Sequence, residues 1–130
     1  MVEVSLQDVI KSISDSESLD IFRTIAKGKV ESEVLKQSKG LSKKQYYSRM
    51  RRLLKTGLVQ RRNGVFMLTH LGAVVYESQK VLETGISNYW KLKAIDSIDA
   101  TGEMGEQERQ KIIKVILDDN TVQNILNDQR

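Results

Sequence analysis

The chain has 130 residues with a hydrophobic fraction of 39% and a net charge of +4, a size that suits one domain or one small domain with an appendage. The absence of cysteine excludes disulfides, thiolate nucleophiles and cysteine-ligated metal sites, and it suits the reducing environment of the cytoplasm. The apolar runs are too short to span a membrane, so we expect a cytoplasmic protein with no membrane partner.

The positive charge is concentrated in one segment. Residues 41–69 carry a charge of +8, whereas residues 1–40 carry −1 and residues 70–130 carry −3. Between Val34 and Tyr76 there is no acidic residue, and the basic residues there are Lys36, Lys39, Lys43, Lys44, Arg49, Arg51, Arg52, Lys55, Arg61 and Arg62. A surface of one sign on an otherwise balanced chain is typical of proteins that bind a polyanion, most commonly double-stranded nucleic acid.

Three short amphipathic helices are predicted before the basic helix. Apolar residues recur at helical spacing after a Ser5 cap, again over about 18–27, and again over about 32–39. In the third helix we expect Val34, Leu35 and Ser38 to face the core.

The start of the next helix has the best-defined local signal. Ser42 and Gln45 match a capping box, in which each side chain binds the backbone N–H at the other's position. Gly57 is placed to end the helix, which is therefore predicted over 42–56. With the preceding helix and a turn at Gly40, this makes a helix-turn-helix.

A β-hairpin is predicted directly afterwards. Asn63-Gly64 joins the runs 58–62 and 65–69, and both loop residues tolerate the positive φ of a type I′ turn. A two-residue loop sets the pairs Arg62–Val65, Arg61–Phe66 and Val59–Leu68.

A helical pattern then runs from Thr69 to about Ala100 and ends at Thr101-Gly102, with Gly85 as the expected bend. Two further helical stretches, around 112–117 and 122–126, are separated near 118–120. The elements together predict a mainly α fold with one β-hairpin. The apolar stripe of the long helix exceeds what one small domain can cover, which favours a homodimer.

The basic helix divides into two faces. Four apolar residues fall on the side predicted to be core: Tyr46, Met50, Leu53 and Leu54. The opposite side collects Lys44, Gln45, Ser48, Arg51, Arg52 and Lys55. An α-helix of this kind fits the major groove of B-form DNA, where Arg and Lys bind guanine and Gln binds adenine.

We assign the candidate DNA contacts by position. Residues near the helix start usually reach base edges, and those here are Lys43, Lys44, Gln45, Tyr47 and Ser48. Cations further along are expected to bind phosphates: Arg51, Arg52 and Lys55, with Arg49 on the flank. The hairpin tip is expected to reach the backbone or an adjacent minor groove with Arg61, Arg62 and Asn63.

Other interpretations remain open at this stage. A charged helix face is most often merely solvated, and such a domain can instead dock an acidic protein partner. The complete absence of acids and the basic hairpin tip favour DNA. His70 is the only histidine, so no metal site or catalytic triad can be assembled, and we expect neither a cofactor nor enzymatic activity. The aromatic residues Tyr76, Tyr89 and Trp90 are expected in packing or a dimer interface, with an effector pocket as the alternative.

The motif that spans these elements is Leu41-Ser42-x7-Met50-x2-Leu53-x3-Gly57-Leu58-Val59, followed by Asn63-Gly64-x-Phe66-x-Leu68-Thr69-x2-Gly72. It resembles the winged helix-turn-helix of archaeal transcriptional regulators, most closely the archaellum-regulator-like (ArnR-like) group and more distantly the MarR- and PadR-type regulators. The resemblance covers roughly residues 18–76. It implies a winged helix-turn-helix DNA-binding domain over 1–73, with a recognition helix at 42–56 and a wing at 58–69. It also implies a helical dimerisation region over 74–130.

Overall fold

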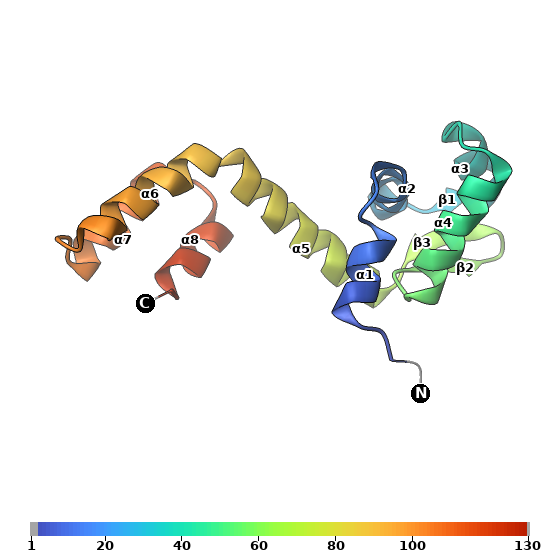
Figure 1. The fold of residues 1–130 in the computed structure, drawn as a ribbon. Coiled ribbons are helices and arrows are strands. Elements are labelled where there is room, and N and C mark those ends of the chain that lie inside the picture. The colour runs from blue at the N-terminus through green and yellow to red at the C-terminus, as the bar shows by residue number, and fades with distance from the viewer. Residues whose placement is uncertain (1–2, 130) are drawn as a thin grey trace. The chain divides into compact units, whose positions relative to one another are not determined.

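The computed structural model describes residues 3–129, apart from the side chain of Ser38. Within this range the chain is mainly helical, with eight helices and one small antiparallel sheet (Figure 1). The elements in chain order are α1 (Leu6–Ser12), α2 (Ser16–Lys27), β1 (Val30–Glu31), α3 (Ser32–Ser38), α4 (Lys43–Lys55), β2 (Val59–Arg62), β3 (Val65–Leu68), α5 (His70–Ser87), α6 (Tyr89–Thr101), α7 (Glu106–Ile116) and α8 (Asn120–Asn127).

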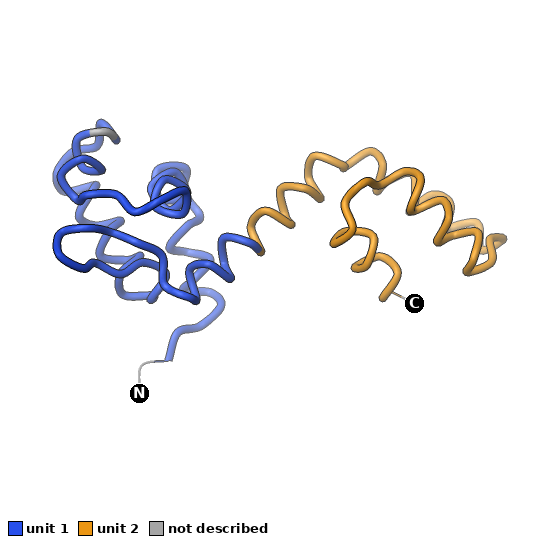
Figure 2. The backbone as a smooth tube through the Cα atoms, turned by 180° about the vertical axis from the view of Figure 1, so that it is seen from behind, with its two compact units in different colours: residues 1–77 blue, residues 78–130 orange. Residues whose placement is uncertain are grey.

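The chain divides into two compact units, residues 1–77 and residues 78–130 (Figure 2). Unit 1 holds the first four helices, the sheet and the start of α5. Unit 2 holds the remainder of α5 and the last three helices. None of the helices within residues 3–129 has both the length and the apolar character that a membrane span requires.

The core of unit 1 lies among α2, α4 and the sheet. Its buried apolar side chains are Ile21, Phe22, Ile25, Leu35, Tyr46, Met50, Leu53, Leu58, Val59 and Phe66. Tyr76 packs against this core through an edge-on contact with Phe22, with ring centroids 6.2 Å apart. Two expectations for the core were wrong: Val34 is 53% exposed and Leu54 is 39% exposed, because each lies at the edge of the apolar face of its helix.

The capping box that begins α4 is confirmed. The Ser42 hydroxyl accepts the N–H of Gln45 at 3.2 Å, and the Gln45 side chain accepts the N–H of Ser42 at 3.2 Å. The helix ends at Lys55, and Gly57 follows with a left-handed φ of 79°. Local sequence therefore fixes both ends of α4.

The hairpin register is also confirmed, with Arg62 opposite Val65, Arg61 opposite Phe66 and Val59 opposite Leu68. Asn63 and Gly64 have φ values of 53° and 75°, the left-handed conformation that a type I′ turn requires. A third strand, β1, was not predicted. It pairs Val30 with Phe66 and Glu31 with Val65, and its two residues are too few to produce an alternating pattern.

Gly72 allows α5 to begin close to the hairpin. A Cβ atom at this position would lie 2.0 Å from the carbonyl oxygen of Leu58, so no larger residue fits without a backbone shift. Thr69 holds the same junction, because its backbone N–H donates to the Leu58 carbonyl at 3.1 Å and its hydroxyl accepts the N–H of Gly72 at 2.9 Å.

The predicted continuous helix from Thr69 to Ala100 was wrong in one respect. It is interrupted at Asn88, three residues beyond the expected bend, where φ is −104° and ψ is 22°. The Asn88 amide donates to the carbonyl of Thr84 at 2.8 Å, and its backbone N–H is shared between the carbonyls of Thr84 and Gly85. Asparagine competes in this way with the regular helical hydrogen bonds.

Unit 2 has a smaller core of its own. Its buried apolar residues are Ile95, Ile113, Leu117 and Val122, with Leu92, Ile116 and Leu126 packed around them. The break predicted near 118–120 is present, and the Asp119 carboxylate caps α8 by accepting the N–H of Val122 at 2.9 Å. The Arg109 side chain is only 6% exposed and forms a bidentate ion pair with Asp99, at 2.8 and 3.2 Å.

Candidate nucleic-acid interface

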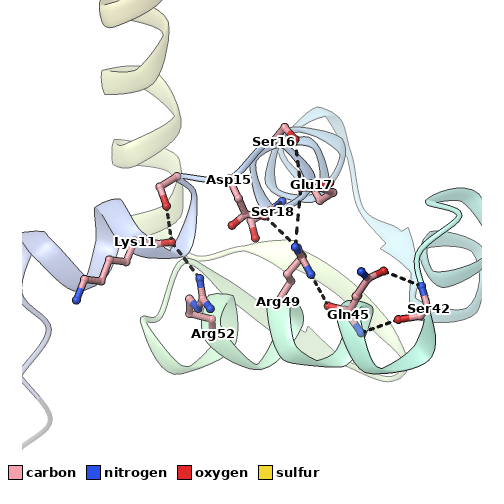
Figure 3. A network of polar contacts seen from close by, with 10 residues as sticks. Lys11, Asp15, Ser16, Glu17, Ser18, Ser42, Gln45, Arg49 and Arg52 are labelled. Carbon is pink, nitrogen blue, oxygen red and sulfur yellow. Dashed lines mark hydrogen bonds and ion pairs between the residues drawn. The ribbon is translucent and has the colours of Figure 1, made fainter.

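One flank of α4 is held by polar contacts to α1 and α2 (Figure 3). The Arg49 Nε lies 2.9 Å from Asp15 Oδ2, and its Nη2 lies 3.8 Å from Glu17 Oε2. The same guanidinium donates to the Gln45 carbonyl at 3.2 Å. Arg49 was predicted as a flanking DNA contact, and in the structure it is paired with Asp15 and Glu17 at the start of α2.

Asp15 has two structural roles in this network. Its carboxylate caps α2 by accepting the backbone N–H of Ser18 at 3.0 Å, and it also accepts from Arg49. Burial raises the pKa of the Asp15 carboxyl, but the hydrogen bonding of Ser18 and the charge of Arg49 outweigh it and lower that pKa to about 2. The carboxylate is therefore ionised at neutral pH and holds Arg49 as a charged pair.

Arg52 is anchored more lightly on the same side. Its Nη1 donates to the backbone carbonyl of Lys11, at the end of α1, over 3.2 Å. A carbonyl neutralises no charge, so Arg52 remains an exposed cation next to this anchor.

The opposite face of α4 has fewer such contacts, although the charge of Lys55, with that of Lys11, helps to lower the pKa of the Asp8 carboxyl in α1, which hydrogen bonds from Ser5 lower most. Arg51 and Lys55 are exposed, and neither has a carboxylate within 4.0 Å among the described residues. Lys43, Lys44 and Ser48 are exposed as well, so the predicted polar face is brought together as one surface. The first turn of α4 contains no acidic residue to weaken its positive field.

Two predicted base-reading residues are partly engaged already. The Gln45 side-chain oxygen is used in the capping box, so pairing with an adenine through both amide groups would require it to share or leave that bond. The Tyr47 hydroxyl accepts from the Lys36 Nζ at 3.2 Å, and the same ammonium lies 5.1 Å from the ring centroid. Tyr47 is 46% exposed and so remains accessible beside the basic face.

The hairpin tip is exposed at Arg61, Arg62 and Asn63, as predicted. The Arg61 guanidinium lies 5.7 Å from the ring centroid of Phe66 and donates weakly to the Ser32 hydroxyl at 3.4 Å. Its charge is thus oriented by neutral groups and not neutralised by an acid. Arg62 has no carboxylate partner within the described part of the chain.

Two lysines of α3 and its C-cap behave differently from each other. Lys36 joins the basic surface through its contact with Tyr47, and sequence reasoning did not include it in the site. Lys39 donates to Asp20 at 2.8 Å and to Thr24 at 2.7 Å, which ties it to α2. From the sequence, Lys36 and Lys39 are both simply members of the basic segment. The packing of α3 beside α4 is what places Lys36, and not Lys39, next to Tyr47.

The geometry holds no sign of a metal centre. Within residues 3–129 no three His, Asp or Glu side chains gather closely enough to hold a metal ion.

No family model matches the chain, and no curated protein or solved structure matches it either.

Proposed function

We propose that unit 1 is a winged helix-turn-helix domain that binds double-stranded DNA, and that the protein is a sequence-specific transcriptional regulator. In this proposal α3 and α4 are the helix-turn-helix, α4 enters the major groove, and the tip of the β2–β3 hairpin is a wing that reaches the backbone or minor groove. It is the arrangement that the resemblance to archaeal regulators implies.

The observation that carries this proposal is the division of the α4 cations. Asp15 and Glu17 occupy Arg49, while neither Arg51 nor Lys55 has a carboxylate within 4.0 Å among the described residues, and Lys55 feels only the exposed Asp8 at longer range. The helix is fixed along one flank and exposes these cations along the other. Such an arrangement favours the binding of an external polyanion. A merely solvated face would have no reason to exclude acids from a segment of 43 residues, 34–76.

We further propose that unit 2 joins two copies of the chain. Leu82, Ile86 and Trp90 are 68%, 74% and 80% exposed, four residues apart along α5 and α6. The small core of unit 2 leaves these side chains uncovered, and a second copy supplies a matching surface by symmetry. Two α4 helices would then contact successive major grooves about 34 Å apart.

The salt dependence of DNA binding tests the first proposal. If each subunit neutralises about four to six phosphates, the slope of log K against log salt for the dimer should be about −7 to −11. Arg51→Ala/Lys55→Ala removes two contacts per subunit, so it should weaken binding to all duplexes and make the slope shallower by about 4. Lys111→Ala/Lys114→Ala removes the same charge from exposed positions of α7 and is the matched control. Fluorescence anisotropy with a random duplex measures the affinity and its salt slope for the wild type and for both double variants.

A slope shallower than about −2, or equal effects of the two double variants, would contradict groove binding. No binding at micromolar protein in low salt would favour the alternative, in which the basic face docks an acidic protein. Sedimentation tests the dimer separately: Leu82→Glu/Ile86→Glu should give monomers, and Val34→Glu, at a position of unit 1 that is 53% exposed, should not.

A further inference from the structure

A hollow of about 600 Å³ lies between α3, α4 and the hairpin. Its volume is within the range of small-molecule sites, about 300–1,000 Å³. Tyr46, Met50 and Phe66 are at most 4% exposed and form its floor. Tyr47 and Leu54, which are 46% and 39% exposed, form its apolar rim. The two α4 side chains at this rim are thus apolar surface left uncovered beside a cationic face.

The cations around the hollow fall into two pairs. Lys36 and Arg61 are oriented by neutral groups, since Lys36 donates to Tyr47 and Arg61 donates to Ser32. Arg51 and Lys55 also line the hollow, and neither has a carboxylate within 4.0 Å among the described residues. Among the described residues that line it, Glu33 of α3 is the only acidic one. The α4 wall is therefore the side where a negative charge is favoured.

We propose that this hollow binds a small amphipathic organic anion, with an aromatic or short aliphatic body against Tyr47 and Leu54 and an acidic group on Arg51 and Lys55. An apolar floor beside two exposed cations that form no close ion pair among the described residues is complementary to such a molecule in both shape and charge. A phosphodiester alone would use the cations but would leave the apolar rim uncovered.

Such a ligand would control DNA binding by direct competition, and this part rests on the proposed function. Arg51 and Lys55 are among the cations that we assign to phosphates, so a ligand that occupies them removes two contacts per subunit. The exclusion needs no conformational change, because the two ligands share the same side chains.

Binding of 1-naphthoate to the full-length protein tests the proposal, with uncharged 1-naphthamide as the comparison. Naphthoate should give saturable shifts of amide resonances in α4 and β3, and naphthamide should bind at least about tenfold more weakly. Arg51→Ala should weaken naphthoate binding about tenfold, whereas Arg52→Ala, the neighbouring arginine on the α1 side, should change it less than about twofold. Leu54→Glu should also weaken it, and Val34→Glu should not.

Several results would overturn the proposal: no saturable binding at millimolar naphthoate, equal binding of naphthamide, or equal losses in Arg51→Ala and Arg52→Ala. Circular dichroism melting of each variant shows whether a loss of binding reflects a loss of fold. Adding naphthoate to the duplex complex should raise the apparent Kd of the wild type and leave that of Leu54→Glu nearly unchanged. If naphthoate binds as expected but the duplex does not, the site stands and the DNA proposal fails. If the duplex binds with the expected salt slope but naphthoate does not bind, the DNA proposal stands and the proposal of a ligand site fails.

Discussion

The ion pair that fixes α4 to α2 makes a quantitative prediction about acid stability. Asp15→Asn removes the charge that holds Arg49 but keeps a side chain able to cap α2, because asparagine is as good an N-cap residue as aspartate. The loss of stability should therefore report what the carboxylate charge contributes, both to the hydrogen bonds from Ser18 and to the pair with Arg49.

The magnitude follows from the pKa of Asp15, which falls from 3.8 to about 2 on folding. A shift of that size corresponds to roughly 2.4 kcal/mol at most, at about 1.36 kcal/mol per unit. The Asp15 side chain is 33% exposed and solvent screens part of the interaction, so we expect about 1–2 kcal/mol. Because the folded pKa is the lower one, this stabilisation is complete above about pH 4 and is lost as the pH falls through about 2.

Urea unfolding followed by circular dichroism measures the effect. At pH 7 Asp15→Asn should be less stable than the wild type by about 1–2 kcal/mol, and at pH 2 the two should agree within about 0.5 kcal/mol. Asp20→Asn is the matched control, because the carboxylate of Asp20 is 63% exposed and its pair with Lys39 should contribute less than about 1 kcal/mol. A difference for Asp15→Asn that is the same at pH 7 and pH 2 would refute the reasoning.

Three further predictions concern packing. Gly72→Ala should destabilise the protein by more than about 2 kcal/mol in urea unfolding, because its Cβ would meet the Leu58 carbonyl. Gly28→Ala is the control. Its position has open space and an extended φ of 166°, so the free energy of unfolding should change by less than about 0.5 kcal/mol. Arg109→Met should destabilise unit 2 by about 2–3 kcal/mol, because it removes the bidentate ion pair with Asp99. Urea unfolding followed by tryptophan fluorescence should then show a transition at a lower urea concentration than in the wild type. Asn63→Val should weaken the hairpin by about 1–2 kcal/mol, because a β-branched residue resists a φ of 53°; an unchanged thermal midpoint would contradict this.

The sequence predicted the elements whose signals are local. The ends of α4 depend on Ser42, Gln45 and Gly57, and the hairpin register depends on Asn63-Gly64, so each could be found within a few residues of the chain. The strand β1 and the interruption at Asn88 could not. The first exists only because β3 lies beside it, and the second depends on one amide that competes for a helical carbonyl.

The candidate site was predictable as a charged segment but not as a set of roles. Helical periodicity placed Arg49 on the flank of the basic face, and only the fold shows that Asp15 and Glu17 reach it from α2. The same periodicity assigned Leu54 to the core, whereas in the structure Leu54 lies at the rim of the hollow. Long-range pairing, of which a single sequence carries no direct record, decides the outcome for Arg49, whereas Leu54 is exposed because it lies at the edge of the apolar face of α4.

The three arginines of α4 show how one short segment serves two purposes. Arg49 and Arg52 point to the flank that α1 and α2 cover, and they bind Asp15 and a backbone carbonyl, whereas Arg51 lies between them in sequence but on the other side of the helix. A helix that is held along one flank presents the other with little freedom to rotate, and a groove-binding helix requires such fixed presentation. Under the proposed function, weakening the Asp15–Arg49 pair should lower DNA affinity by loosening the orientation of α4. Asp15→Asn should lower affinity without changing the salt slope, because it removes orientation and no phosphate contact. A changed slope in that variant would show that Arg49, once released, binds DNA itself.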